Sequence, residues 1–286
     1  MIRNGVHSEN RSRRGSDKLR SMSNHSVSDQ RNYWDRNLDP ANLGQSGKDL
    51  LRRFAAEEKF YLVPDRKIFL QEIDPSNHKI CVEVGAGLSY QTFHLARLGF
   101  TVVACDISLE RLRVLRTLAQ AMLSDDEFRR IKFVACQAEE MPFRAGVIDV
   151  ISTRAVLIHT DIERAVDECV RILSPCGVAV FSEPMKYNPL VNLYRCTLAP
   201  QEWRTIARYF TEDEVGLVSK RFPHVRVHFH YLFSFLAFVW QYGVAIPSLF
   251  WLSFRVLDVF DRALMRILPP LRKYVWFVTL VCRKSA

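Results

Sequence analysis

The sequence predicts an α/β fold built around a doubly wound, mostly parallel sheet. Two observations lead to this prediction. Between residues 79 and 182, short apolar runs alternate with segments of helical periodicity. Such alternation indicates right-handed crossover units, which place parallel strands in one sheet with helices on both faces. A glycine-rich turn also follows the first apolar run, at the edge where sheets of this kind bind ligands.

The expected elements follow one another along the chain from residue 79. Apolar runs predict strands over 79–84, 101–105, 131–135, 147–152 and 177–182. Apolar residues at helical spacing predict helices over 90–98, 109–122 and 163–173. Thr211 then opens a capping box that predicts a helix over 211–220. Two further strands are expected over 224–233 and 274–282.

The composition is that of a folded globular protein, with 48% hydrophobic and 25% charged residues among 286. It excludes a wholly disordered, collagen-like or disulfide-stapled chain. The seven cysteines form no CxxC pair, which favours a reduced protein without a structural zinc site. No apolar segment follows the N-terminal charges, so we expect a cytoplasmic protein without a secretory signal.

The net charge of +9 gathers partly in residues 1–30, which are rich in Arg and Ser. These residues contain too few apolar groups to offset the loss of chain entropy, so they are expected to form a disordered basic tail. A solvated tail is the first interpretation, and attraction to anionic lipid or nucleic acid is the alternative.

The chemistry of the chain is concentrated in the glycine-rich turn. Gly85 and Gly87 let backbone amides approach a ligand closely, and the following helix N-terminus favours an anionic group. Asp106 ends the next strand about 20 residues later, where an acid accepts hydrogen bonds from ribose hydroxyls. The ligand is therefore a nucleoside, either a nicotinamide dinucleotide or S-adenosylmethionine (SAM). Tyr90 occupies the position where a dinucleotide site needs a small residue, and Glu83 before the turn favours SAM.

Four motifs in the same order resemble those of the class I SAM-dependent methyltransferases, especially the branch that methylates small molecules and quinones. They are Glu83-Val84-Gly85-Ala86-Gly87, the "D-A-E-x-L-P-F"-like residues 137–143, the fourth-strand residues 146–152 and the "R-V-L-K-P-G-G"-like residues 170–177. The resemblance covers residues 79–183 and implies a seven-stranded Rossmann-like sheet, SAM as cofactor and methyl transfer as the activity.

The resemblance also implies which residues bind the cofactor. They are Glu83, Gly85, Ala86, Gly87, Asp106, Ile107, Gln137, Ala138, Glu139 and Thr153. Gln137 departs from the family, which often has an Asp that contacts the adenine amino group, although a Gln carbonyl can accept the same bond. Cys176 replaces a glycine before the fifth strand and is expected to affect folding more than chemistry.

The candidate catalytic residues lie at the carboxyl ends of the fourth and fifth strands, where open sheets bind ligands. His159 has the right pKa range for a general base, or it is a structural contact at the edge of the cofactor. Arg154 is expected either to hold an anionic substrate or to pair with an acid. Glu183 either contacts substrate or ends its strand.

Tyr33 and Trp34 precede the core and resemble the "Y-W-D" lid segment of related enzymes. Two interpretations stay open. The aromatic rings cover the methionine end of SAM and exclude water, or they only dock the N-terminal helix onto the core.

An apolar insertion over 234–273 separates the last two expected strands, and no Asp, Glu, Lys or Arg occurs between Val227 and Phe254. We expect two helices that cap the active site and offer an apolar face to lipid or to a hydrophobic substrate, with basic residues suited to anionic headgroups. The alternatives are a fully buried cap or dimer contact, and true membrane insertion. His228 and His230 share a strand face, but the sequence offers no third ligand there, so no metal site is expected.

The sequence therefore predicts a SAM-dependent methyltransferase that acts on a small-molecule or lipid-like acceptor, with peripheral membrane contact through 234–273 and no nucleic-acid partner. The alternatives are a catalytically silent SAM-binding or membrane scaffold protein and an NAD(P)-dependent reductase. The expected organisation is a tail over 1–30, a helical lid over 31–76, the SAM-binding core over 77–233, the insertion, and a final core strand over 274–286. The oligomeric state is not predicted.

Overall fold

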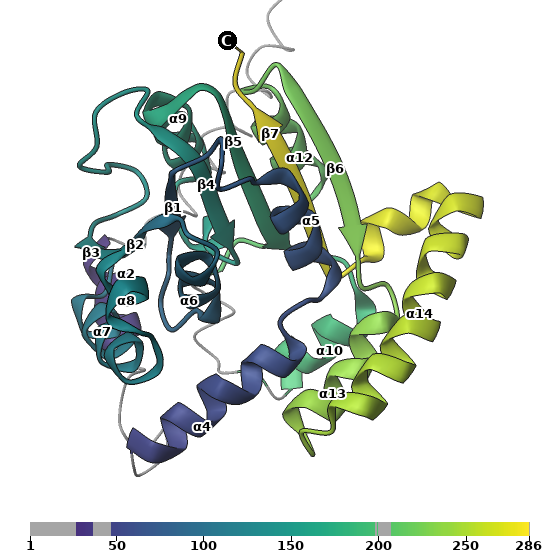
Figure 1. Cartoon of the computed structure of the whole chain (residues 1–286). Helices are drawn as coiled ribbons and strands as arrows, with labels where there is room; N and C mark the ends of the chain where they lie inside the picture. Colours follow the sequence, from purple (N-terminus) through teal and green to yellow (C-terminus); the bar gives the residue numbers. More distant parts are fainter. Residues whose placement is uncertain (1–26, 37–46, 198, 200–206, 286) are drawn as a thin grey trace, which may run out of the picture.

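The computed structural model describes residues 27–36, 47–197, 199 and 207–285. Within these residues the chain folds around a seven-stranded sheet in the order β3-β2-β1-β4-β5-β7-β6 (Figure 1). Only β7 runs antiparallel to its neighbours in this sheet. The strands are β1 Ile80–Val84, β2 Thr101–Asp106, β3 Ile131–Ala135, β4 Ile148–Arg154, β5 Leu173–Pro184, β6 His224–His230 and β7 Phe277–Arg283. The predicted α/β class and doubly wound sheet are confirmed.

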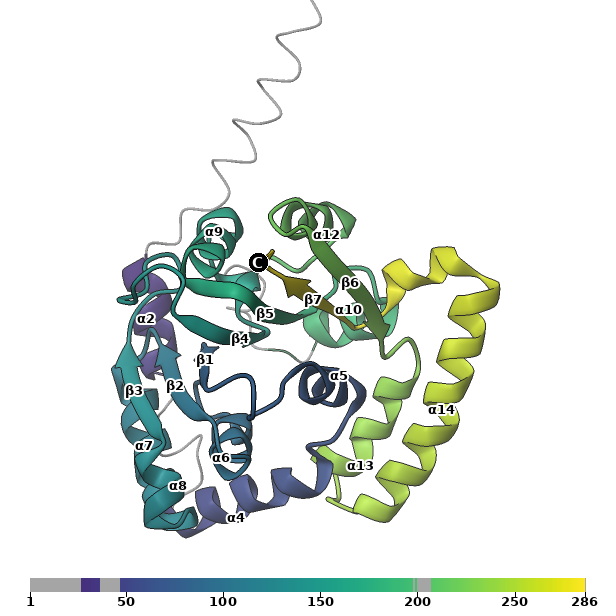
Figure 2. The same cartoon turned by 45° about the horizontal axis from the view of Figure 1, so that its top comes forward.

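Helices cover both faces of the sheet (Figure 2). One face carries α4 (Gly47–Glu57), α5 (Pro64–Glu72), α6 (Tyr90–Arg97) and α7 (Leu109–Met122). The other face carries α9 (Ile162–Ile172) and α12 (Glu212–Ser219). The remaining helices are α2 (Val27–Arg36), α8 (Asp125–Arg129) and α10 (Pro189–Thr197), with short 3-10 turns η1 (Glu58–Phe60) and η2 (Leu157–His159).

The central strands are buried on both faces because alternate side chains enter two different cores. In β1, Val82 and Val84 pack with the α9 side, whereas Cys81 packs with the α6 side. Burial on both faces explains why the strands appear in the sequence as nearly continuous apolar runs rather than as alternating ones. It also fixes the register, since a shift of one residue would exchange the two sets.

The order of the strands reverses between β1 and β4, which are neighbours although β2 and β3 lie between them in sequence. Ligands of open α/β sheets bind beyond the carboxyl ends of the strands at such a reversal. The fold therefore places the glycine-rich turn after β1 and the end of β4 side by side.

Most element boundaries agree with the sequence prediction, and the exceptions have local causes. Strand β4 continues to Arg154, and β5 begins at Leu173 rather than at residue 177. The expected strand 224–233 is too long, because β6 ends at His230. Tyr231 has a φ of +68°, and the Asp261 carboxylate accepts hydrogen bonds from the amides of Leu232, Phe233 and Ser234. These amides are therefore turned away from the sheet.

The insertion forms η3 (Ser234–Ala237), α13 (Phe238–Tyr242), α14 (Pro247–Ile267) and η4 (Pro269–Tyr274), so the last strand begins at Phe277 rather than at 274. Pro247 occupies the first turn of α14, where a missing N–H costs nothing. Within the described residues, no helix is both long and apolar enough to cross a membrane.

The N-terminal expectation is tested only in part. Helix α2 begins at Val27, so the last residues of the expected 1–30 tail are helical. Residues 1–26 of that tail lie outside the described part of the chain.

Candidate active site

The turn after β1 leaves no room for side chains. Gly85 and Gly87 have φ angles of +67° and +49°, which side chains strongly disfavour. A Cβ on Gly85 would lie 2.4 Å from Cγ2 of Val156, which belongs to the loop after β4. The amide of Ala86 donates to the Cys105 carbonyl at 2.8 Å, which ties the turn to β2. The turn therefore packs closely where the carboxyl ends of β1, β2 and β4 meet.

Asp106 closes the turn from the end of β2. Its two carboxylate oxygens accept the amides of Gly87 and Ser108, each at 2.8 Å. Burial raises the pKa of Asp106, and these two amides together with Arg111 oppose the shift. Each carboxylate oxygen accepts more than one hydrogen bond, so Asp106 keeps capacity for a ligand's hydroxyl groups. Ile107, between Asp106 and Ser108, is half-buried.

Glu83 supports the turn from within β1. The side chain is buried, and its Oε2 accepts the hydroxyl of Thr92 at 2.6 Å. Burial raises the pKa of Glu83, and the Thr92 and Ser89 hydroxyls oppose this shift. Ser89 itself caps α6, since its Oγ accepts the Gln91 amide at 3.1 Å. Glu83 therefore fixes the turn and the start of α6 relative to each other.

Helix α2 lies against the same edge of the sheet. The Arg111 guanidinium stacks over the Trp34 ring, with its central carbon 4.5 Å from the ring centroid. The Trp34 ring also meets the His159 ring edge to face, with centroids 5.2 Å apart. Tyr33 packs edge to face on Trp34 at 4.9 Å. Trp34 therefore links the Asp106 side of the site, through Arg111, to His159 in the loop after β4. Asp106, Trp34 and His159, which lie in separate segments of the sequence, thus come together at one edge of the sheet.

The segment after β3 has mainly structural contacts. Glu139 accepts the amide of Asp161 at 2.9 Å and so holds the start of α9. Gln137 is half-buried, and its side-chain amide donates to Glu140 at 3.3 Å. Ala138 is buried in the core on the α9 face. Of the three residues, Gln137 and Glu139 thus already have protein partners.

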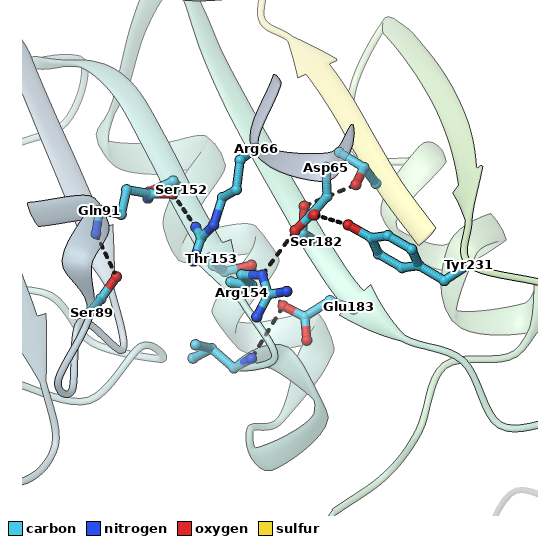
Figure 3. A network of polar contacts seen from close by, with 12 residues as sticks. Asp65, Arg66, Ser89, Gln91, Ser152, Thr153, Arg154, Ser182, Glu183 and Tyr231 are labelled. Atoms are coloured by element: carbon cyan, nitrogen blue, oxygen red, sulfur yellow. Dashed lines mark hydrogen bonds and ion pairs between the residues drawn. The ribbon is translucent and has the colours of Figure 1, made fainter. Parts of the chain in front are cut away.

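Thr153 and Glu183 form a buried pair at the ends of β4 and β5 (Figure 3). The Thr153 hydroxyl donates to Oε1 of Glu183 at 2.7 Å, and the Val156 amide donates to the same oxygen at 3.3 Å. The other oxygen, Oε2, is buried and has no hydrogen-bond partner among the described residues. Burial raises the pKa of Glu183 to about 7, although the hydroxyl and nearby loop amides oppose it. Glu183 therefore holds the loop that carries Val156 against Gly85.

Arg154 pairs with an acid, as one of the two sequence interpretations expected. Its Nε donates to Asp65 on α5 at 2.8 Å, and its guanidinium lies 4.8 Å from the centroid of the Phe277 ring. The buried Tyr231 hydroxyl donates to the other oxygen of Asp65 (Figure 3). Burial opposes ionisation of Asp65, but Arg154, Arg66 and the Tyr231 hydrogen bond outweigh it and lower its pKa. The Arg154 side chain remains 31% exposed beyond this contact.

Two solvent-exposed groups lie near Arg154. The surrounding protein raises the pKa of the Glu57 carboxyl although the side chain reaches the surface, and the charges of Arg66 and Arg154 oppose this shift. Tyr242, on α13, is 75% exposed, and the pKa of its phenol is raised by nearby protein and by Glu57, with Arg154 in opposition. These groups are close enough to influence one another's ionisation while remaining open to solvent.

Sequence reasoning missed Asp65, Arg66, Arg111 and Tyr231. Arg66 donates to the Gln91 side chain, and Gln91 in turn donates to Ser152 at 2.8 Å (Figure 3). One signal was available, since Asp65 and Arg66 directly follow Pro64, which begins the helix. Nothing in the sequence shows that β4 and β6 meet this pair.

The residues at the β1–β2 edge fit an adenosyl cofactor. A Cβ on Gly87 would lie only 3.2 Å from Arg111 and 3.7 Å from Asp106, so a side chain there would crowd the Asp106 carboxylate. Backbone without bulky side chains, a carboxylate able to accept ribose hydroxyls and an aromatic ring lie together there. A group of three or more His, Cys, Asp or Glu arranged to bind a metal is not found in the described parts of the chain.

Comparison with known proteins agrees with this geometry. Residues 82–181 match the family model described as a methyltransferase domain. A ubiquinone biosynthesis O-methyltransferase of Paracidovorax citrulli (strain AAC00-1) is 28% identical over 152 residues, which is 51% of this chain and 62% of that protein. The match thus spans less than two thirds of that relative's length.

Two solved structures share the fold at low identity. A phosphoethanolamine N-methyltransferase 2 of Haemonchus contortus aligns with a TM-score of 0.58 and 15% identity, over 91% of this chain and 60% of that one. The geranyl diphosphate C-methyltransferase of Streptomyces coelicolor A3(2) aligns with a TM-score of 0.56 and 11% identity, over 93% of this chain and 99% of that one. Residues 82–181 of this chain therefore form a methyltransferase domain of the class I family, whose cofactor is S-adenosylmethionine.

Proposed function

We propose that this protein transfers a methyl group from SAM to a small-molecule or lipid-like acceptor. The observation that carries the proposal is the turn at Gly85 and Gly87, closed by the Asp106 carboxylate at the reversal point of the sheet. The match of residues 82–181 to a methyltransferase domain supports it.

In this proposal the β1–β2 edge holds the cofactor. Asp106 accepts the ribose hydroxyls, the backbone of Gly85–Gly87 lies close to the methionine part, and Trp34 covers the site with His159 against its ring. Arg66, which projects from α5 toward Gln91 and Ser152, supplies positive charge for the methionine carboxylate (Figure 3). SAM supplies the reactive methyl group, so the protein contributes mainly alignment and the exclusion of water.

The ends of β4 and β5 face the acceptor in this proposal. Asp65 fixes the Arg154 guanidinium through Nε, and the charge of Arg154 acts on the exposed Tyr242 and Glu57. We assign Arg154 to an anionic group of the acceptor, because a guanidinium held by a buried carboxylate is already oriented. Glu183 is fully buried, so we assign it a positioning role for the loop at Val156 rather than contact with substrate.

The test is incubation of the purified protein with methyl-labelled SAM and a metabolite and lipid extract, followed by mass spectrometry of labelled products. Methyl transfer is expected to an extract component, with formation of S-adenosylhomocysteine. SAM binding without any labelled product would favour the silent scaffold alternative. Saturable NADH binding with no SAM binding would favour a reductase.

We also propose that α14 rests on a membrane surface. The helix exposes apolar side chains at helical spacing, among them Leu252 at 66% and Val256 at 64% exposed. Arg255, Arg262 and Arg266 lie on the same helix, and cations beside an exposed apolar stripe suit an anionic interface.

Vesicle flotation tests this contact. The intact protein should float with vesicles that contain phosphatidylglycerol and much less with pure phosphatidylcholine. The double variant Leu252→Asp, Val256→Asp should lose flotation by about fivefold or more. The matched variant Leu109→Asp, Val147→Asp, which changes exposed apolar residues elsewhere, should float normally. Equal flotation of both variants would contradict the contact.

A further inference from the structure

A large groove lies away from the candidate active site. It is a groove of about 1010 Å³ between α5, the edge strand β6 and α14. Figure 2 shows α14 on the outer side of β6, beyond the last strand of the sheet. A chain of aromatic contacts joins the groove to the acceptor side of the candidate active site. The Phe254 ring lines the groove and contacts Tyr231 at 5.9 Å, and Tyr231 contacts Phe277, which lies under Arg154.

The lining of the groove is strongly basic. Six cationic side chains line it against two carboxylates, and the cations are Lys59, Lys67, Arg255, Arg262, Arg266 and Arg272. Both carboxylates are already paired, Asp258 with Arg262 at 3.2 Å and Glu58 with Arg97 at 3.5 Å. Arg255 and Arg266 have no ion-pair partner in the described part of the chain. The groove therefore carries uncompensated positive charge along α14.

The floor of the groove is apolar. Val227 and Phe229 of β6 line it, together with Trp251, Phe254 and Met265 of α14. The Trp251 ring is held in place, because its Nε1 donates to the Lys59 carbonyl at 3.0 Å. An apolar floor beneath a cationic rim matches a ligand with a hydrocarbon part and an anionic head.

A buried imidazole gives a second, independent indication of a ligand. His230 lines the groove, is only 7% exposed, and its Nε2 has no hydrogen-bond partner among the described residues. Burial lowers the pKa of His230 to about 4, so the ring is neutral at physiological pH. A buried polar atom without a partner is costly unless something binds it. The neighbouring His228, whose ring stacks on His230 at 6.4 Å, also lines the groove with an unpartnered Nε2.

We propose that this groove binds an amphipathic anion, a hydrocarbon chain that carries a phosphate or carboxylate group. The chain lies on Phe229, Phe254 and Trp251, and the head group meets Arg255 and Arg266 on the rim. The Nε2 of His230 is buried, so it bonds a polar atom of the ligand only when the ring turns toward the groove. The site is distinct from the proposed methyl-transfer site and does not depend on methyl transfer.

Calorimetric titration with dodecyl phosphate below its micelle concentration tests the proposal. Inorganic phosphate and dodecyl maltoside serve as probes with only the head or only the chain. Dodecyl phosphate should bind saturably and at least about tenfold more tightly than either of the others. Tryptophan emission should change with dodecyl phosphate in the intact protein, and this change should be largely lost in Trp251→Phe.

Charge reversal locates the head group. The double variant Arg255→Glu, Arg266→Glu should bind dodecyl phosphate at least about tenfold more weakly. Arg116→Glu changes an exposed arginine on α7 and should bind normally. Far-UV circular dichroism should show that both variants are folded, as expected for surface changes.

Three results would overturn the proposal. They are equal binding of dodecyl maltoside, equal binding of inorganic phosphate, and unchanged affinity in the folded double variant. Because the readout is binding alone, a failure of methyl transfer would leave this result untouched.

Discussion

The two sides of the ligand-binding edge are built differently. On the β1–β2 side, Asp106 holds the glycine turn through backbone amides 2 and 19 residues away in sequence. On the β4–β5 side, Asp65 holds Arg154, from which it is 89 residues distant in sequence. Asp65 is in turn held by Tyr231, which is 166 residues from Asp65. The first side uses backbone and local contacts, and the second uses side chains from distant segments.

This difference teaches which part of such a site can vary. Backbone geometry at Gly85 and Gly87 leaves little choice of residue, because any side chain meets a positive φ or a neighbouring group. The Arg154–Asp65 pair requires only that opposite charges meet in a largely buried position, and many combinations of residues can meet that requirement. The cofactor side is therefore expected to be rigid and the acceptor side to determine specificity. Four variants test this comparison.

The largest effect is expected on the cofactor side, from Gly85→Ala. The new Cβ would lie 2.4 Å from Val156 at a φ of +67°, so unfolding free energy should fall by about 3 to 4 kcal/mol and SAM binding should vanish. Gly146→Ala is the matched control, because it has a φ of +69° and nothing within 4 Å. It should cost about 1 kcal/mol and leave binding intact. Calorimetry measures SAM affinity and urea unfolding measures stability in both variants. Normal SAM affinity in Gly85→Ala would contradict the role assigned to the turn.

On the acceptor side, Asp65→Asn should destabilise the protein by about 3 kcal/mol at neutral pH. It leaves the mostly buried Arg154 without its carboxylate, and breaking such pairs is costly. Asp258→Asn removes a similar but exposed pair with Arg262 and should cost about 0.5 kcal/mol or less. Urea unfolding of both variants gives the comparison. Equal losses would mean that burial does not distinguish the two pairs.

Glu183 should make stability fall as the pH rises. Its folded pKa of about 7 is raised from 4.5, so the folded state binds more protons between these values. The stabilising contribution is complete below about pH 4.5 and is lost as the pH rises through 7, a change of about 3 kcal/mol. The unfolding free energy of the parent protein and of Glu183→Gln is measured at pH 4.5 and at pH 8. The variant should lose less stability between the two pH values than the parent does, and the difference should equal the contribution of Glu183. An identical decrease in both proteins would show that Glu183 ionises normally.

The smallest effect is expected for His159→Ala, which connects the two sides through Trp34. Loss of one edge-to-face ring contact should weaken SAM binding about fivefold. The pH–rate profile of methyl transfer should keep its shape, because the proposal gives His159 a positioning role. A large fall in kcat together with loss of one limb of that profile would instead identify His159 as the general base.

The sequence predicted the cofactor side better than the acceptor side, for a physical reason. The alternating runs, the turn at Gly85 and the acid at Asp106 are local patterns, and local backbone geometry determines them. The Asp65–Arg154–Tyr231 group forms only when α5, β4 and β6 come together, so no single segment records it. The end of β6 was wrongly placed for the same reason, since Asp261 on α14 binds the amides that the expected strand would have used.

The central claim is that Asp106 and the glycine turn bind SAM, and calorimetry on two aspartate variants tests it most directly. Asp106 and Asp149 each accept two backbone amides, but Asp149 accepts those of Lys79 and Ile80 at the opposite end of β1. The parent protein and Asp149→Asn should bind SAM saturably, whereas folded Asp106→Asn should bind about tenfold to a hundredfold more weakly. No binding by the parent, or unchanged affinity in Asp106→Asn, would contradict the account.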